Sequence, residues 1–193
     1  MLRIPRVWRN RPVNVTRIVA KQSHFDLCVI GGGPAGIAAA LRAVDYNKRV
    51  CLVEANRIGG TDVWNGTLQS KTLWEMAKYA SRLSGNAARR VFEDDVVAGL
   101  QSKVSDARVL RTLQEVSATR ERQLLEVLRA AGVQLVLGRG MFSSPYELDV
   151  RSSGTGEYNV LTADYFVIAT GSTPRTHPHV VTDCHRVVTT DTI

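Results

Sequence analysis

The feature that most constrains the fold is a glycine-rich turn that joins a short apolar segment to an alanine-rich one. The apolar run Phe25–Ile30 stops at Gly31-Gly32-Gly33-Pro34-Ala35-Gly36. Segment Ile37–Asn47 then has a helical composition, and Arg49–Glu54 is a second apolar run that ends in an acid. Continuously apolar strands are typical of a parallel sheet covered on both faces. The order therefore predicts a strand, a turn, a helix and a second parallel strand.

The spacing Gly31-x-Gly33-x-x-Gly36 is typical of a dinucleotide-binding turn. In such turns the first glycine permits the tight bend, the second lets the backbone approach a pyrophosphate, and the third lets the helix pack on the strand. The helix amino terminus faces the phosphates with unpaired N–H groups. Glu54 ends the second strand, where an acid can accept hydrogen bonds from ribose hydroxyls. We predict an adenine dinucleotide site, which this pattern alone assigns neither to a flavin nor to a nicotinamide. The alternative is a glycine-rich turn without a ligand.

The rest of the chain predicts an α/β fold, a Rossmann-like parallel sheet with a helical excursion and a β-hairpin. We expect a basic amino-terminal extension over residues 1–23 and one dinucleotide-binding domain over residues 24–193. Two further helices are expected, over Ser70–Leu83 and Val96–Ala131, with a break at Ser84–Asn86 between them and a C-cap at Gly132. A strand is expected over Gln134–Leu137, followed by a turn at Gly138-Arg139-Gly140. The remaining expected elements are a hairpin of Glu147–Arg151 and Tyr158–Leu161 and a last strand over Tyr165–Ala169.

Two further motifs give the chain a family resemblance. The segment Gly59–Lys71, GGTDVWNGTLQSK, resembles the redox loop GGTCxxxxCxPSK of the pyridine nucleotide-disulfide oxidoreductases. The segment Ala169–Pro174, ATGSTP, is similar to the ATGSxP of that family. Thr67 stands at the second cysteine position, as in the soluble pyridine nucleotide transhydrogenases, the subgroup that the chain resembles most. The resemblance implies the first half of an FAD-binding domain.

If the contacts of that family apply, the resemblance also implies a set of FAD-binding residues. The pyrophosphate would lie against the glycine turn, and the acid at the end of the second strand would hold the adenosine ribose. The Lys71 ammonium would polarise the reactive edge of the flavin ring. The full set of implied cofactor-binding residues is Gly31, Gly33, Pro34, Ala35, Gly36, Glu54, Gly60, Thr61, Lys71, Gly140, Ala169, Thr170 and Gly171.

The departures from the family motif bear on catalysis. Disulfide exchange needs a thiolate and a partner thiol, and the two family cysteine positions hold Asp62 and Thr67. Gln69 replaces the proline before the Ser-Lys pair. The negative charge of Asp62 would also disfavour an anionic reduced flavin. We expect no disulfide reductase activity, and a non-catalytic FAD-binding subunit or assembly factor in which FAD is kept as a structural ligand or lost. The alternative is a split oxidoreductase whose nicotinamide-binding part is supplied by another chain.

The net charge of +7 is concentrated at the amino terminus, where residues 1–25 carry six basic residues and no acid. An arginine-rich, acid-free start is typical of a mitochondrial transit peptide, so we expect a protein of the mitochondrial matrix within a larger protein assembly. The alternative is a basic arm that contacts RNA or a partner protein. No apolar run is long enough for a membrane span.

Three minor groups of residues complete the predictions. The cysteines Cys28 and Cys51 fall within apolar runs and are expected to be small buried residues. No metal site is predicted, because the spacing of the carboxyl-terminal histidines and cysteine matches no standard one. The basic residues of the long helix are interleaved with acids and are expected to form a solvated face of mixed charge, with RNA contact as the alternative. The residues concerned are His177, His179, Cys184 and His185 for the metal, and Arg108, Arg111, Arg120, Arg122, Arg129, Glu115, Glu121 and Glu126 for the helix.

Overall fold

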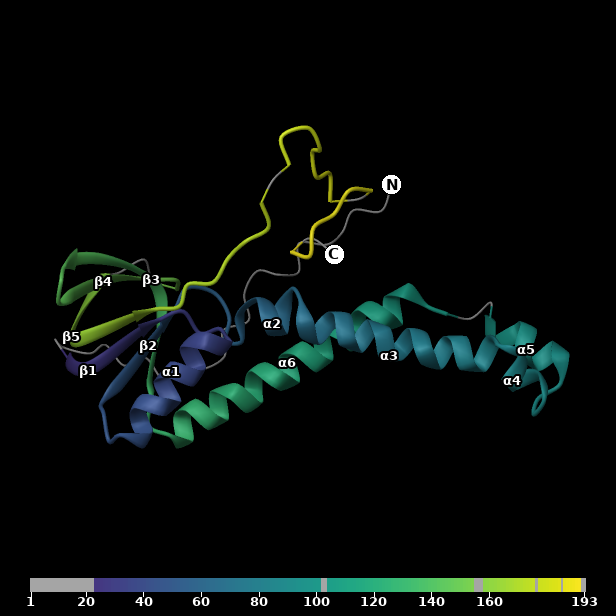
Figure 1. Ribbon diagram of the computed structural model, residues 1–193, viewed down its shortest axis with the longest axis horizontal. Coiled ribbons are helices and arrows are strands. Elements are labelled where there is room, and N and C mark those ends of the chain that lie inside the picture. Colours follow the sequence, from purple (N-terminus) through teal and green to yellow (C-terminus); the bar gives the residue numbers. More distant parts are fainter. Residues whose placement is uncertain (1–22, 102–103, 155–157, 176, 185, 192–193) are drawn as a thin grey trace.

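The computed structural model describes residues 23–101, 104–154, 158–175, 177–184 and 186–191, and it has two visibly different parts. One is a compact α/β body that contains the strands, and the other is an elongated arm of helices that extends from it (Figure 1). The predicted extension lies outside the described residues except for Ser23, which opens the first strand.

The parallel part of the sheet is built on the predicted strand–turn–helix–strand unit. Strand β1 (Ser23–Ile30) lies between β2 (Val50–Glu54) and β5 (Tyr158–Ile168), and both neighbours run parallel to it. Helix α1 (Pro34–Asp45) connects β1 to β2. Strand β3 (Gln134–Ser144) continues the parallel sheet beyond β2. The Rossmann-like α/β prediction is confirmed.

The described strands close into a ring because two long strands change partners along their length. Strand β3 leaves β2 after Leu137 and pairs antiparallel with β4 (Glu147–Ser152). The first half of β5 pairs antiparallel with β4, and β5 also runs along β1 as far as Ile168. The predicted hairpin is confirmed, but β5 is one continuous strand where we had expected two.

The turn expected at Gly138-Arg139-Gly140 is wrong, because β3 runs through all three residues. A Cβ atom at Gly138 would lie 2.5 Å from the Arg151 carbonyl oxygen, and one at Gly140 would lie 2.9 Å from Leu148 Cδ2. These glycines allow β3 and β4 to approach closely, which is a known role of glycine inside strands.

The sheet is covered on both faces, as its apolar strands predicted. One core packs α1, through Ile37 and Ala40, and α6 (Asp106–Ala130), through Leu128, onto the sheet. The other core fills the inside of the ring. It contains Phe25, Cys28, Ile30, Cys51, Val53, Leu148, Val150, Leu161 and Ala163. Cys28 and Cys51 are fully buried and face each other across β1 and β2, so their predicted role as buried residues is confirmed.

The helical arm differs from the sequence prediction in its breaks. It contains α2 (Gly60–Trp64), α3 (Thr67–Ser84), α4 (Asn86–Arg89), α5 (Asp94–Gln101) and α6. The single long helix predicted from Val96 is wrong, since Ser105 has extended dihedrals and α6 begins anew at Asp106. An acid in the first turn favours such a start. The break between α3 and α4 is confirmed. The C-cap of α6 is Ala131, one residue before the predicted Gly132, which follows it with a left-handed φ of +74°.

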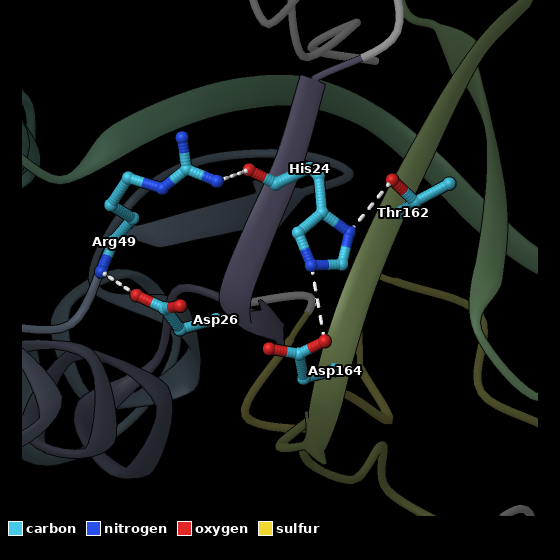
Figure 2. Close-up of polar contacts among 5 residues, drawn as sticks. All are labelled: His24, Asp26, Arg49, Thr162 and Asp164. Carbon is cyan, nitrogen blue, oxygen red and sulfur yellow. Dashed lines mark hydrogen bonds and ion pairs between the residues drawn. The ribbon is translucent and has the colours of Figure 1, made fainter.

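Polar contacts tie the strands together at the end of the sheet where β1 begins (Figure 2). His24 Nδ1 lies 3.2 Å from Thr162 Oγ1, and His24 Nε2 lies 3.0 Å from Asp164 Oδ1. The Arg49 backbone N–H donates to Asp26, and its guanidinium donates to the His24 carbonyl oxygen. These contacts join β1 to β5 and to the residue that leads into β2. Of the helices described, none is both long and apolar enough to cross a membrane.

Candidate dinucleotide-binding site

The glycine turn lies where β1 ends, between β2 and the segment that follows β5. The Gly31 N–H donates to the Val53 carbonyl at 2.8 Å, and the Ala169 N–H donates to the Ile30 carbonyl at 2.8 Å. Gly31 has φ +108°, and a Cβ atom there would lie 2.2 Å from the Ala169 carbonyl oxygen. The turn therefore requires glycine at this position, both because φ is positive and because a side chain would collide with the Ala169 carbonyl. Gly31, Ala169 and Thr170 are in direct proximity.

The start of α1 combines a crowded glycine with an open one. A Cβ atom at Gly36 would lie 1.8 Å from the Gly31 carbonyl oxygen, so the helix can pack there only without a side chain. At Gly33, by contrast, no atom outside Gly33 and its two chain neighbours lies within 4 Å of the position a Cβ would occupy. Pro34 begins the helix, whose first turn has no acid and no side-chain cap. The open space thus lies at the positive end of α1, which suits a phosphate.

Glu54 is fixed beside the same turn. Its carboxylate accepts a hydrogen bond from the Gly32 N–H at 2.6 Å and another from the Asn56 N–H at 2.7 Å. The residue is only 9% exposed. A carboxylate has about four lone-pair positions, so two remain for further donors such as ribose hydroxyls. The predicted acid is therefore held next to the glycine turn.

The chain after β2 returns to contact the glycine turn. The Gly59 N–H donates to the Gly32 carbonyl at 2.8 Å, and both Gly59 and Gly60 have positive φ. A Cβ atom at Gly60 would lie 3.0 Å from Gly33 Cα. Gly60 and Gly33 are thus packed together, and the exposed Thr61 follows them in α2.

The other predicted positions are less closely gathered, and all the cofactor contacts stay predictions. Lys71 is exposed on α3, one turn after Thr67. Gly140 lies on β3 beyond Leu137, the residue that pairs with Glu54. Gly171 is exposed and has φ +71°.

An ion pair between a buried carboxylate and a partly exposed guanidinium joins this region to α6, and the sequence did not reveal it. Arg57 Nε donates to Glu121 Oε1 at 3.2 Å, and Arg57 Nη2 donates to Glu121 Oε2 at 2.5 Å. The same guanidinium lies 3.3 Å from the centroid of the Trp64 ring. Glu121 is 7% exposed, so its prediction as part of a solvated face is wrong. Its partner is 64 positions away in the sequence, and no local pattern pairs them.

Two more hydrogen bonds hold the same segment. The Ser117 hydroxyl, fully buried on α6, donates to the Val63 carbonyl at 2.8 Å. The Trp64 indole N–H donates to the Ile58 carbonyl at 3.1 Å. The Ser117 side chain of α6 therefore holds the backbone of α2, and the Trp64 side chain of α2 holds the residues just before that helix.

Residues 25–191 match the family described as pyridine nucleotide-disulphide oxidoreductase, which is nearly the whole described chain. The chain belongs to this family. The resemblance found in the motifs at the glycine turn, after it and after β5 is thereby confirmed.

Similar proteins within the family include soluble pyridine nucleotide transhydrogenases. The one from Mycobacterium bovis (strain BCG / Pasteur 1173P2) is 32% identical over 171 residues, which cover 88% of this chain and 36% of the relative. The one from Marinobacter nauticus is 31% identical, over 89% of this chain and 36% of the relative. A dihydrolipoyl dehydrogenase of Zymomonas mobilis is 31% identical, over 83% of this chain and 33% of the relative. The matched region of this oxidoreductase-family chain spans about a third of the length of these relatives.

The redox loop of this family member carries no cysteine. Asp62 lies in α2 and is partly exposed, and the exposed Thr67 begins α3. Among the described residues, no three potential metal ligands come together. His185, one of the residues considered for a metal, lies outside the described part.

Proposed function

We propose that this chain binds FAD at the glycine turn and does not carry out thiol–disulfide exchange. The observation that supports this most directly is the open space at Gly33, at the amino end of α1, where the missing side chain leaves the backbone accessible. Membership of the pyridine nucleotide-disulphide oxidoreductase family favours FAD over other dinucleotides.

The residues around this space have complementary tasks. The N–H groups of the first turn of α1 would bind the pyrophosphate, because the helix end carries partial positive charge. The Glu54 carboxylate would accept hydrogen bonds from the adenosine ribose. The Gly32 and Asn56 N–H groups already hold this carboxylate in one orientation, which favours such binding. Lys71 would lie toward the flavin ring, if the family contact applies. FAD itself would supply hydride and electron-transfer chemistry.

The loss of thiol chemistry follows from the side chains at the two redox positions. Asp62 and Thr67 cannot alternate between dithiol and disulfide, which that reaction requires. Two of the cysteines, Cys28 and Cys51, are buried inside the ring, where a substrate disulfide cannot reach their thiols. We therefore propose a flavin-binding subunit or assembly factor of a larger mitochondrial complex, where FAD serves as a structural ligand.

The experiment is a titration of the purified full chain with FAD, followed by flavin fluorescence and by calorimetry. We expect saturable binding, together with no reduction of lipoamide, glutathione or thioredoxin in the presence of NADH or NADPH. An absence of FAD binding would exclude the binding proposal, and disulfide reduction would exclude the non-catalytic one.

A second candidate is a split oxidoreductase completed by another chain, and one edge of β5 favours it. Strand β4 pairs with β5 only as far as Thr162, whereas β1 pairs with it up to Ile168. Along this last part of β5, Tyr165 is 74% exposed and Ile168 is 67% exposed. Exposed apolar strand edges are suited to pairing with a further strand.

The split candidate predicts a stable partner chain with its own dinucleotide-binding turn. Native mass spectrometry of the complex from its source would detect that partner, and Tyr165→Lys would weaken its association. A particle without such a chain would exclude this candidate. Contact with RNA through the basic extension is a third possibility, for which affinity must fall steeply with salt.

A further inference from the structure

Helix α6 reaches the proposed cofactor site through an unbroken series of contacts. Glu121, on α6, binds Arg57, and Arg57 stacks on Trp64 at the end of α2. The segment between Arg57 and Trp64 contains Gly59 and Gly60, which touch the glycine turn. Glu121, Arg57 and Trp64 do not belong to the resemblance-based set of binding residues, whereas Gly60 and Thr61 of the segment between them do.

The Arg57 guanidinium is held in one orientation by its contacts. Two of its three nitrogen atoms donate to the two oxygens of one carboxylate, at 3.2 and 2.5 Å, and its central carbon lies 3.3 Å from the centroid of the Trp64 ring. The Glu121 side chain is only 9% exposed, whereas that of Arg57 is 43% exposed. Removing either partner breaks the two-point contact, and removing the guanidinium also leaves the buried Glu121 carboxylate without its charge partner.

Both ends of the Arg57–Trp64 segment are thereby fixed to α6. At the first end, the side chain of Arg57 binds Glu121, and the Gly60 N–H approaches the Arg57 carbonyl at 3.4 Å. At the second end, the Val63 carbonyl accepts from Ser117 of α6, and the Trp64 indole closes back onto Ile58. The segment, which includes α2, is thus bound to α6 near both of its ends.

The two glycines in the middle of this segment make that fixation necessary. Glycine has more backbone freedom to lose than any other residue, and Gly59 and Gly60 both occupy positive φ. An unfastened Gly-Gly pair would have to be ordered when a ligand binds, and that ordering lowers affinity. Fastening the segment in advance removes this loss from the binding step.

We propose that Glu121 is a positioning residue for dinucleotide binding. Acting through Arg57 and Trp64, it holds Gly59 and Gly60 against Gly32 and Gly33 and so keeps the cofactor site formed before the ligand arrives. This inference rests on the proposed function for its effect on affinity, but the ordering of the glycine segment is a property of the chain alone.

The test uses the full chain, with FAD as the probe, and compares Glu121→Gln with Glu75→Gln. Glu75 forms an exposed ion pair with Lys78 on α3 and serves as the matched control. Two quantities are measured below the melting transition. They are the FAD dissociation constant and the hydrogen exchange of residues 58–66, in which the Gly59 N–H to Gly32 carbonyl bond is the reporter.

We expect Glu121→Gln to weaken FAD binding by about tenfold or more, equivalent to about 1.4 kcal/mol, and to speed exchange in residues 58–66. Glu75→Gln should change neither quantity. Exchange and affinity both equal to the unmodified chain, or a lowered melting temperature alone, would overturn the proposal. If the unmodified chain binds no FAD, the proposed function fails, while the exchange data still decide whether Glu121 orders the segment.

A second variant covers the case in which Glu121→Gln does not fold. Arg57→Lys keeps the positive charge at a partly exposed position but loses the two-point contact and the ring stacking. It should weaken FAD binding and speed exchange in the same direction. A double variant that exchanges the two residues, Arg57→Glu with Glu121→Arg, should restore part of the FAD affinity and part of the protection from hydrogen exchange. An Arg57→Lys chain that matches the unmodified one in both quantities would also overturn the proposal.

Discussion

Two glycines of the turn, Gly33 and Gly36, allow an experiment that separates dinucleotide binding from folding. Gly33→Ala places a methyl group in open space at the start of α1, whereas Gly36→Ala places one 1.8 Å from the Gly31 carbonyl oxygen. The first change is expected to impair dinucleotide binding while leaving the fold intact. The second is expected to damage the fold directly.

The magnitudes follow from the local backbone. Gly33 has φ −79° and ψ −176°, which alanine adopts readily, and such a change stabilises by about 0.4–1 kcal/mol through the unfolded chain. Alanine is a poorer N-cap than glycine by a comparable amount, so the net change in stability should be below about 1 kcal/mol. At Gly36 the helix must move off the strand, and overpacking of this kind costs about 1–3 kcal/mol.

At Gly33 the new methyl group would collide with a bound pyrophosphate, so we expect a loss of binding free energy in the same range as for overpacking. A loss of about 1–3 kcal/mol corresponds to a rise in the FAD dissociation constant of roughly fivefold to 150-fold. Calorimetric titration measures this directly. At about 2–4 °C per kcal/mol, thermal unfolding should show a midpoint that shifts by less than about 4 °C for Gly33→Ala and falls by roughly 2–12 °C for Gly36→Ala.

Two results would refute this reasoning. Unaltered FAD affinity in Gly33→Ala would show that the open space is not where the dinucleotide lies. A Gly36→Ala chain as stable as the unmodified one would show that α1 does not need its close approach to Gly31.

Three further predictions concern buried groups. The hydrogen bond with Cys28, together with burial, raises the pKa of the Cys51 thiol far above its ordinary value. A thiol reagent at pH 8 should therefore modify only the exposed Cys184 in the folded chain and all three cysteines in denaturant; rapid native reaction of Cys28 or Cys51 would contradict this. Because the unfolded Cys51 would ionise above about pH 9 while the folded one stays protonated, its contribution to stability should fall as the pH rises further. Ser117→Ala should lower the free energy of unfolding by about 1–3 kcal/mol in urea, since it leaves the buried Val63 carbonyl without its donor; a change within about 0.3 kcal/mol would argue against that bond.

The sequence predicted the parts of the fold that depend on local pattern. The apolar runs before and after the glycine turn, and the acid that ends the second, were enough to predict β1, α1 and β2. The hydrogen bond from Gly32 to Glu54 then shows why an acid suits that position.

What the sequence did not predict depends on contacts between distant residues. Gly138 and Gly140 have the composition of a turn, but the close approach of β4 explains them as strand residues. Glu121 has acidic and basic neighbours like any solvated helix face, and only the packing of α2 on α6 makes it a buried partner of Arg57. The apolar residues from Val96 to Ala131 follow one helical pattern across Ser105, so the sequence did not reveal that a new helix, α6, begins at Asp106.

The pairing of β1 with β5 has a consequence for how the chain acquires its structure. His24 and Thr162, which meet across these two strands, are separated by 138 residues. Native contacts of such high sequence separation slow folding, because a long stretch of chain must be ordered before they form. During synthesis β1 can associate early with α1 and β2, but it must wait for nearly the whole described chain before its second neighbour emerges from the ribosome. Ring closure is therefore expected to be a late folding step, and until then one side of β1 is available to chaperones.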